Sequence, residues 1–325
     1  MKRRKLGSLE VSAVGLGCMS MTPIYGQPDP AEAIATIQRA PEIGIDFLDT
    51  SDAYAHGANE DLLAKAIAGR RDQFIIATKF GNLRNPDGTA AVNGKPEYVL
   101  EACDASLRRL GIDTIDLYFI HRVDPTVPIE DTVGAMATLV HQGKVRHLGI
   151  SEAGPATIRR AHATHPLAAL QTEYSLWSRD VEAELLGVCR ELGIGFVAYS
   201  PLGRGFLTGA VSNADSLAAN DVRRNMPRFQ GENLQANLDL LGEVAALAET
   251  EGCTQAQLAL AWVLSRGDTI VPIAGTSRRR WLEQTAAAAE IRLSVATLKR
   301  LEEIFKPGVA QGTRYPAGMM SRLGL

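Results

Sequence analysis

The sequence contains few of the features that mark specialised classes of protein. Its 325 residues include only four cysteines, and aromatic residues make up 6% of the chain. The cysteines form no C-x-x-C pair, and none stands near a histidine at metal-ligand spacing, which argues against a disulfide framework or a cysteine-based zinc site. Scattered thiols are typical of reduced cytosolic proteins, so we expect a cytoplasmic location. They are Cys18, Cys103, Cys189 and Cys253.

A surplus of charge and a long apolar run are also absent. Lys and Arg number 34 against 37 for Asp and Glu, a net charge of -3. A chain so near neutrality has no overall attraction for nucleic acid or an anionic membrane. No run approaches the roughly 18 apolar residues of a membrane-spanning helix, and the basic start Lys2–Lys5 lacks the apolar stretch of a signal peptide. We therefore expect a small-molecule ligand, with no nucleic-acid or membrane partner.

The chain does contain a regular alternation of short apolar runs and helical patterns. Such alternation predicts βα units and a parallel sheet. Eight units in about 300 residues fit a closed barrel better than an open sheet, so we predict an α/β fold with a single (β/α)8 TIM-barrel domain over residues 1–325. The predicted strands are Val11–Gly17, Ile45–Leu48, Phe74–Lys79, Ile115–Ile120, His147–Ile150, Ala168–Gln171, Gly195–Tyr199 and Thr269–Ile273.

Proline and glycine mark the ends of the predicted helices. Pro96 and Pro155 suit first turns, and a glycine follows several last turns, as at Gly44, Gly111 and Gly193. The helices expected after the strands are Ala31–Ile43, Glu60–Ala68, Pro96–Leu110, Ile129–His141, Pro155–Ala163, Val181–Leu192 and Arg279–Ala289.

Further segments lie outside the eight units. A hairpin over Lys2–Leu6 and Leu9–Ser12 is expected to plug the bottom of the barrel, and Ser294–Phe305 to form an extra C-terminal helix. The interval between the last two strands is too long for a plain connection, and long loops in compact domains are usually functional. It holds the polar stretch Ser212–Asn233 and the predicted helices Leu234–Thr250 and Gln255–Ser265.

Reactive residues follow directly after several predicted strands. The active sites of such barrels lie at the C-terminal strand ends, so these residues should converge on one mouth. Singly, each has an ordinary alternative, such as a helix cap, a solvated lysine or a structural histidine. Together, an acid, a tyrosine, a lysine and a histidine suit proton delivery to a carbonyl oxygen. The four residues are Asp49, Tyr54, Lys79 and His121.

Each of these residue types has a part in that chemistry. A phenol with a pKa near ~10 is a poor acid at neutral pH, and a nearby ammonium such as Lys79 moves that pKa toward the working range. We expect Asp49 to pair with Lys79 and fix its charge. His121 would donate to the carbonyl oxygen and orient it.

The strand-end residues belong to longer segments that occur in a specific order. These are Gly44–Tyr54, Ala77–Gly81, Ile115–Arg122, Gly143–Ser151, Gln171–Ser175, Tyr199–Gly209 and Pro272–Ser277. In this order they resemble the aldo-keto reductases, in particular the bacterial branch related to the potassium-channel β subunits. The resemblance runs from about Lys5 to Leu301. It implies an oxidoreductase with NADPH/NADP+ as its cofactor that reduces aldehydes and ketones to alcohols, with the hydride from the nicotinamide and the proton from Tyr54. Its catalytic tetrad would be Asp49, Tyr54, Lys79 and His121.

The resemblance also implies which residues contact the cofactor. It assigns Ser151 and Gln171 to the nicotinamide carboxamide and Tyr199 to stacking on the nicotinamide ring. The loop after Tyr199 lies on the pyrophosphate side, where glycines let the backbone approach phosphate closely. The complete set is Gly17, Cys18, Met19, Asp49, Ser151, Gln171, Tyr199, Ser200, Pro201, Leu202, Gly203, Arg204, Gly205, Gly275, Thr276, Ser277, Arg278, Arg279, Gln284 and Thr285.

Three arginines stand where the family binds the adenosine phosphate. Arg278, Arg279 and Arg280 at a helix start are electrostatically odd without an anion, because that end of a helix is already positive. A bound phosphate resolves the oddity. The sequence departs from the family's usual Asn at Glu152, and from its usual Glu-Asn pair at residues 284–285.

Other functions fit less well. A Rossmann dehydrogenase is disfavoured because Gly15-Leu16-Gly17 is not followed by the third glycine of its fingerprint. A metal-dependent barrel hydrolase would need paired histidines near a strand end, whereas His162 and His165 lie in or just after a predicted outer helix. A redox-sensing regulatory subunit remains an alternative, because channel β subunits share the fold and the cofactor site.

The substrate pocket is expected to be apolar or aromatic, although Arg122 leaves an anionic substrate possible. We expect Arg223 and Arg224 to form a surface pair, with closure over the cofactor as the alternative. The sequence is also compatible with a homo-oligomer. The expected pocket residues are Met19, Tyr25, Phe80, Arg122, Trp177, Phe206 and the loop Gly81–Lys95.

Overall fold

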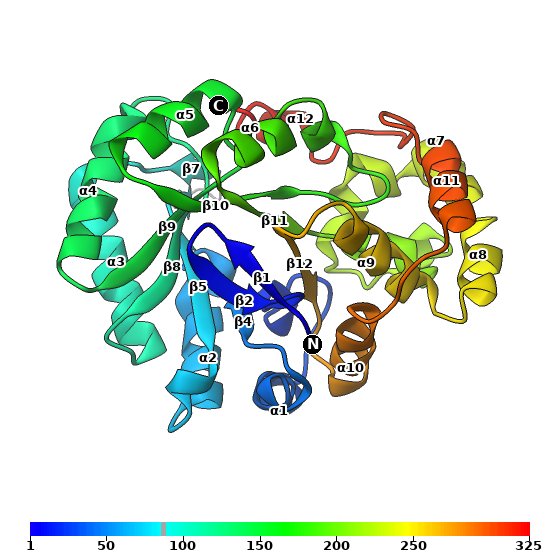
Figure 1. The fold of residues 1–325 in the computed structure, drawn as a ribbon, viewed down its shortest axis with the longest axis horizontal. Coiled ribbons are helices and arrows are strands. Elements are labelled where there is room, and N and C mark those ends of the chain that lie inside the picture. The colour runs from blue at the N-terminus through cyan, green and yellow to red at the C-terminus, as the bar shows by residue number, and fades with distance from the viewer. Residues whose placement is uncertain (86–88) are drawn as a thin grey trace.

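A closed barrel of eight parallel strands forms the centre of the computed structural model, which describes residues 1–85 and 89–325 (Figure 1). Neighbouring strands pair in parallel around the whole ring. The predicted (β/α)8 barrel is therefore confirmed. Its strands are β3 (Gly15–Gly17), β4 (Phe47–Asp49), β5 (Ile75–Phe80), β8 (Ile115–Ile120), β9 (Val145–Ser151), β10 (Leu167–Glu173), β11 (Gly195–Tyr199) and β12 (Ile270–Gly275).

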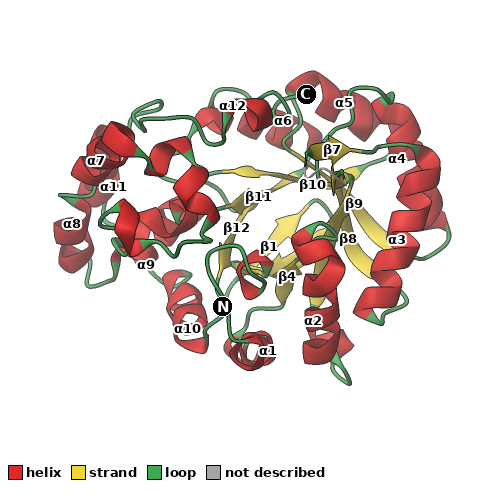
Figure 2. Cartoon of the chain, turned by 180° about the vertical axis from the view of Figure 1, so that it is seen from behind, coloured by secondary structure: helices red, strands yellow, loops and turns green. Residues whose placement is uncertain are grey.

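Helices surround the barrel as an outer layer (Figure 2). Pro96 and Pro155 each occupy the first turn of a helix, and the glycines at 44, 111 and 193 adopt the left-handed conformation that ends one. The helices are α1 (Pro30–Arg39), α2 (Ala58–Ile67), α3 (Pro96–Leu110), α4 (Ile129–His141), α5 (Pro155–Thr164), α6 (Leu185–Leu192), α7 (Gly231–Leu240), α8 (Val244–Thr250), α9 (Gln255–Ser265), α10 (Arg279–Ala288), α11 (Val295–Ile304) and α12 (Ala317–Met320).

Several predicted bounds were wrong for identifiable reasons. The first helix ends at Arg39, because Pro41 has no N–H to continue it and starts a short 3-10 turn instead. The single helix predicted over Leu234–Thr250 is two helices, α7 and α8, separated by a break that contains Gly242. The Val181–Leu192 helix begins only at Leu185, after a separate 3-10 turn.

The first barrel strand is also shorter than the predicted Val11–Gly17. Val11 and Ser12 belong instead to β2 (Leu9–Ser12), which pairs antiparallel with β1 (Arg3–Leu6). The chain bends between the two strands, where the Ser12 hydroxyl donates to the carbonyl of Val14 at 2.7 Å. One apolar run therefore serves two strands of different sheets.

The predicted N-terminal hairpin does plug one end of the barrel (Figure 1). Leu6 and Val11 are fully buried and belong to one apolar cluster with interior residues of the strands. The approach is close, since a Cβ added at Gly195 would lie 2.4 Å from Leu6 Cα. Glycine at this place in β11 leaves room for the hairpin.

The loop Gly81–Lys95 contains secondary structure that the sequence did not predict. β6 (Asn82–Arg84) and β7 (Ala90–Val92) pair as an antiparallel hairpin. Residues 86–88 of this loop, which the sequence assigned to the substrate pocket, lie outside the described residues. Over residues 1–85 and 89–325, no helix is long and apolar enough to cross a membrane.

We predict that the hairpin plug contributes measurably to stability. Leu6→Ala removes a fully buried side chain, and such truncations lower the free energy of unfolding by about 2–5 kcal/mol. Urea unfolding followed by circular dichroism measures the change. Lys5→Ala, at an exposed position of the same strand, is the control and should change little. Equal stability of the two variants would show that the hairpin is not part of the cooperative core.

Candidate functional site

The barrel interior explains why reactive side chains meet at one mouth. Alternate residues of a strand point to the same side. Phe47, Ala77, Phe119, Ala169 and Val197 all belong to the apolar cluster inside the barrel. Two residues further along each of these strands, a polar side chain points to the same side of the strand as the buried apolar one. These are Asp49, Lys79, His121, Gln171 and Tyr199.

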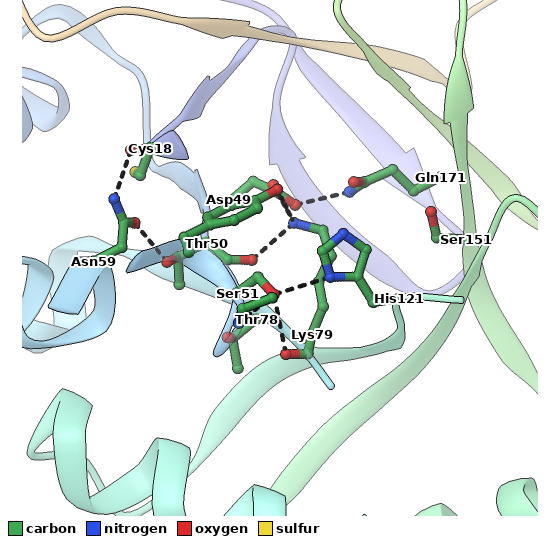
Figure 3. A network of polar contacts seen from close by, with 12 residues as sticks. Cys18, Asp49, Thr50, Ser51, Asn59, Thr78, Lys79, His121, Ser151 and Gln171 are labelled. Atoms are coloured by element: carbon green, nitrogen blue, oxygen red, sulfur yellow. Dashed lines mark hydrogen bonds and ion pairs between the residues drawn. The ribbon is translucent and has the colours of Figure 1, made fainter. Parts of the chain in front are cut away.

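Asp49 and Lys79 meet at the ends of β4 and β5 (Figure 3), and Tyr54 joins them in one connected group. The Lys79 ammonium donates to Asp49 Oδ1 at 2.5 Å, to the Thr50 carbonyl at 2.7 Å and to the Tyr54 hydroxyl at 3.2 Å. Its Nζ also lies 5.0 Å from the centre of the Tyr54 ring. The structure thus places the predicted acid, lysine and tyrosine in direct contact.

The ion pair keeps a buried lysine charged. Lys79 is fully buried and Asp49 is 2% exposed. Burial alone would lower the pKa of Lys79, but Asp49 and Tyr54 raise it, and the net effect is a pKa above the ordinary value. The second oxygen of Asp49 accepts a hydrogen bond from Gln171 Nε2 at 2.7 Å, so the carboxylate is held from two sides.

The pKa of Tyr54 corrects part of the sequence-based expectation. Lys79 lowers this pKa, as predicted, but burial raises it by more, so the phenol stays above its ordinary value. Tyr54 is therefore protonated at neutral pH. A protonated phenol beside an ammonium is arranged to give up a proton rather than to take one.

His121 is the neutral member of the four. Burial, with contributions from Arg122 and Lys79, holds the pKa of His121 well below its ordinary value. Ser51 Oγ lies 3.0 Å from His121 Nδ1 (Figure 3). When the serine hydroxyl donates to Nδ1, the proton of the neutral ring resides on Nε2. The Tyr54 and His121 ring centres are 5.9 Å apart and the rings are nearly perpendicular.

A second polar network, which the sequence did not predict, adjoins the tetrad. Glu152 is 3% exposed and accepts from the Tyr199 hydroxyl at 2.8 Å and from both terminal nitrogens of Arg314 at 3.0 Å. The hydroxyl oxygen of Tyr315 lies 3.0 Å from the hydroxyl oxygen of Tyr199. The resemblance ended near residue 301, so Arg314 and Tyr315 carried no signal in the sequence.

The C-terminal segment is therefore part of the mouth. The Gly154 N–H donates to the Leu325 carbonyl at 2.7 Å, and the Gly324 N–H donates to the Glu152 carbonyl at 2.9 Å. Glu152 itself has a φ of 54°, in the left-handed region that non-glycine residues rarely adopt. These contacts hold the last residues of the chain beside the end of β9.

The loop after β11 has an unusual backbone. Ser200, Gly203, Arg204 and Gly205 all have φ between 48° and 88°. Successive residues of this kind can turn backbone N–H groups toward an anion. The Arg204 side chain points into the protein, where it pairs with Glu173 at 2.8 Å.

Arg223 and Arg224 behave differently from each other. Arg223 donates to the Arg204 carbonyl at 2.9 Å, and its guanidinium lies 5.0 Å from the centre of the Tyr25 ring. It is therefore not a plain surface residue. Arg224 instead donates to carbonyls of its own loop, at Leu217 and Ala218.

The three arginines at the start of α10 have different environments. Arg279 pairs with Glu32 of α1 at 2.9 Å, and the guanidinium of Arg280 lies 4.2 Å from the Trp281 ring centre. Within residues 1–85 and 89–325, the exposed side chain of Arg278 has no ion pair or hydrogen bond. Nearby, the Thr276 hydroxyl accepts from the Arg278 N–H at 3.1 Å.

The remaining cofactor candidates lie around the same rim or beneath it. Gly17 is the register partner of both Gly275 and Asp49. Cys18 is fully buried, and its carbonyl accepts from Asn59 at 2.8 Å (Figure 3). Thr285 is 6% exposed, and the Gln284 carbonyl accepts from Gln257 at 3.2 Å. Met19, Pro201, Leu202 and Ser277 lie in the loops that connect these residues.

Three residues assigned to the substrate pocket are instead packed in the core. Phe80 is fully buried and stacks on Tyr118, with ring centres 4.9 Å apart. Trp177 and Phe206 stack on each other at 4.1 Å and are at most 3% exposed. Aromatic rings gain more from packing together than from facing water. Among residues 1–85 and 89–325, no group of three or more His, Cys, Asp or Glu side chains could hold a metal ion.

Known proteins are similar to this chain in sequence and in fold. The model of the aldo/keto reductase family matches residues 13–306. A glycerol dehydrogenase from Gluconobacter oxydans, AKR11B4, is 27% identical, with 97% of each chain covered and a TM-score of 0.85. The aldo-keto reductase AKR11C1 from Bacillus halodurans, in its holo form, is 31% identical over 96% of this chain and 98% of its own, with a TM-score of 0.78. An aldo-keto reductase from Klebsiella pneumoniae in complex with NADPH is 26% identical over 97% and 99%, with a TM-score of 0.74.

Asp52 provides a test of the electrostatics beside the tetrad. Burial and the neighbouring Glu60 raise the pKa of Asp52 to about 7. The ionised form of Asp52 is therefore disfavoured in the folded protein. As a result, the free energy of unfolding falls as the pH rises from about 4, the pKa of an unfolded Asp, through the folded pKa of about 7.

We predict that Asp52→Asn is more stable than the wild type at pH 8 by at most about 4 kcal/mol, with a smaller gain at pH 5. Urea unfolding of both proteins at several pH values measures the difference. Asp61→Asn, at an exposed position on α2, is the control. A difference between wild type and Asp52→Asn that stays constant from pH 5 to 8 would contradict the raised pKa.

Proposed function

The chain belongs to the aldo/keto reductase family, and we propose that it is an NADP(H)-dependent enzyme that reduces aldehydes or ketones to alcohols, with Tyr54 as the proton donor. The observation that carries the proposal is the contact between the Tyr54 hydroxyl and the Lys79 ammonium, 3.2 Å apart, with Asp49 on the other side of the lysine. A phenol, an ammonium and a carboxylate in this order form a unit in which the phenol can release one proton and the ammonium can stabilise the resulting phenolate.

The proton is released from the Tyr54 hydroxyl to the carbonyl oxygen. A nicotinamide cofactor held at the mouth would supply a hydride, from its own C–H bond, to the carbonyl carbon, so that one C–H and one O–H bond would form in the product. As the O–H bond of Tyr54 breaks, negative charge develops on the phenolate oxygen. The Lys79 ammonium stabilises this charge without moving, and Asp49 and Gln171 hold the lysine in place.

Neutral His121 has a separate part. Its Nδ1 faces Ser51, which leaves the Nε2–H to donate to the carbonyl oxygen and orient it toward Tyr54. A charged imidazolium would compete with Tyr54 as the acid. The low pKa of His121 therefore supports Tyr54 as the donor.

The residues at the mouth fit a nicotinamide dinucleotide. The left-handed turns at Ser200, Gly203, Arg204 and Gly205 suit the pyrophosphate. We assign Ser151 and Gln171 to the carboxamide, Tyr199 to the nicotinamide ring and the start of α10 to the adenosine phosphate. Structures of a Klebsiella pneumoniae relative are described in complex with NADPH and with NADP, which supports this choice of cofactor.

The experiment that tests the proposal is steady-state NADPH oxidation by wild type and Tyr54→Phe. Loss of a positioned general acid lowers the rate by roughly 10²–10⁴-fold, whereas NADPH affinity should change little. Tyr118→Phe is the matched control, because the Tyr118 hydroxyl is buried without a hydrogen-bond partner among the described residues. Wild-type turnover in Tyr54→Phe would exclude Tyr54 as the donor. A single slow turnover by the wild type would instead favour the regulatory-subunit alternative.

A second prediction concerns the choice between NADPH and NADH. Arg278 is the arginine at the start of α10 whose side chain is uncommitted within the described residues, whereas Arg279 is already paired with Glu32. A hydrogen bond to a charged group contributes about 1.5–3 kcal/mol. Arg278→Ala should therefore weaken NADPH binding by roughly 10–100-fold.

The same substitution should have little effect on NADH, which lacks the 2′-phosphate. Fluorescence titration of Arg278→Ala and Arg279→Ala with both cofactors measures the four affinities. The Arg279 variant is the control and should lose less NADPH affinity than the Arg278 variant. Equal weakening for NADH and NADPH would show that these arginines do not contact the phosphate.

A further inference from the structure

The guanidinium of Arg122 lies beside the tetrad without an acidic partner. Arg122 directly follows His121, donates to the His121 carbonyl at 2.7 Å and lies 3.4 Å from Ser151 Oγ. Its charge is close enough to lower the pKa of both His121 and Tyr54. Within residues 1–85 and 89–325, no carboxylate forms an ion pair with it.

Two buried acids near the mouth, Glu152 and Glu173, are already paired with other arginines. Glu152 accepts from Arg314 with both of its oxygens. Glu173 pairs with Arg204 at 2.8 Å and lies 3.6 Å from Arg228. Three arginines thus face these two carboxylates even before Arg122 is counted. Neither acid is left to form an ion pair with Arg122.

Burial removes hydration from the Arg122 guanidinium, and Tyr199, Tyr315 and Glu152 offset this loss, so that its pKa stays above the ordinary value. None of them forms an ion pair with Arg122, and an incoming anion could provide that direct contact. Arginine suits a carboxylate in particular, since its planar fork can donate two parallel hydrogen bonds to the two oxygens. The energetics therefore favour a ligand with a carboxylate at this place.

A small cavity adjoins the guanidinium. Its volume is about 30 Å³, and Arg122, Arg322, Asn82 and Tyr315 provide its polar lining. Since about 10–15 Å³ of such space is enough to hold one water molecule, the cavity admits a small polar group and not an aromatic ring. The second guanidinium, Arg322, comes from the C-terminal segment. The cavity thus offers two positive charges and further hydrogen-bond donors to one small group.

We propose that Arg122 binds the carboxylate of the substrate, and that the enzyme therefore prefers aldehydes or ketones that carry a carboxylate. This inference rests on the proposed carbonyl reduction. It replaces the apolar or aromatic pocket expected from the sequence, because Phe80, Trp177 and Phe206 are packed in the core. His121 holds the carbonyl end of the substrate, and the next residue in the chain holds the carboxylate end.

The test compares pairs of aldehydes in which one member carries a carboxylate and the other has an uncharged group at the same position. The first pair is 4-formylbenzoate and its methyl ester, and the second is 4-oxobutanoate and butanal. The wild type should show a higher kcat/KM for the anionic member of at least one pair. Arg122→Gln should reduce this preference by roughly 10–100-fold, the worth of a charged hydrogen bond. Arg122→Lys, which keeps one positive charge, should retain part of it.

A control variant separates this local effect from a change in net charge. Arg190 is exposed on α6, and Arg190→Gln removes the same charge far from the mouth. It should leave the preference unchanged. Equal kcat/KM for charged and neutral substrates in the wild type, or an equal loss on both in Arg122→Gln, would overturn the inference.

A binding measurement keeps the inference distinct from the proposed function. Calorimetric titration of the NADPH complex with 4-(hydroxymethyl)benzoate and with its methyl ester requires no turnover. Tighter binding of the carboxylate by the wild type, lost in Arg122→Gln, supports the anion site even if none of the four carbonyl compounds is reduced. Failure of reduction alone would count against the proposed function, whereas equal binding of acid and ester would count against the role of Arg122.

Discussion

The buried ion pair between Lys79 and Asp49 is the constraint on which the site depends. A lysine that is fully buried inside a barrel stays charged only while a carboxylate faces it. Asp49 is itself held by Gln171, from the far side of the ring. The pair thus connects β4, β5 and β10, so the closure of the barrel and the charge of the lysine support each other. Tyr54 contacts this pair from a loop, and its acidity depends on a position that the barrel sets.

The polar layer at the mouth continues the apolar layer beneath it. Five of the eight strands, β4, β5, β8, β10 and β11, place an apolar side chain inside the barrel, and two residues later a polar one in the same direction. The hairpin β1–β2 closes the opposite end with Leu6 and Val11. A packed interior with one plugged end leaves the other end for chemistry, and its rigidity holds Lys79 at hydrogen-bonding distance from Tyr54.

Features with a local physical cause could be predicted from the sequence. The apolar runs of β8 and β11 and the first-turn prolines of α3 and α5 determine their elements almost without reference to the rest of the chain. Contacts between distant segments could not be predicted. The pairing of Arg279 with Glu32 joins residues 247 positions apart, and no local pattern indicates it. The same holds for Phe80, which looks like a pocket residue at the end of its strand until Tyr118 is seen to stack on it.

The departure at Glu152 shows how one substitution relative to the family pattern changes the surroundings of the site. A neutral side chain at this position would need hydrogen bonds only, whereas a buried carboxylate needs a counter-ion. Arg314 supplies it from the C-terminal segment, which brings Tyr315 against Tyr199. Glu152 also raises the pKa of Arg122, but both of its oxygens accept from Arg314 and it forms no ion pair with Arg122. The same carboxylate therefore brings the end of the chain into the mouth and leaves the positive charge beside His121 available to a ligand.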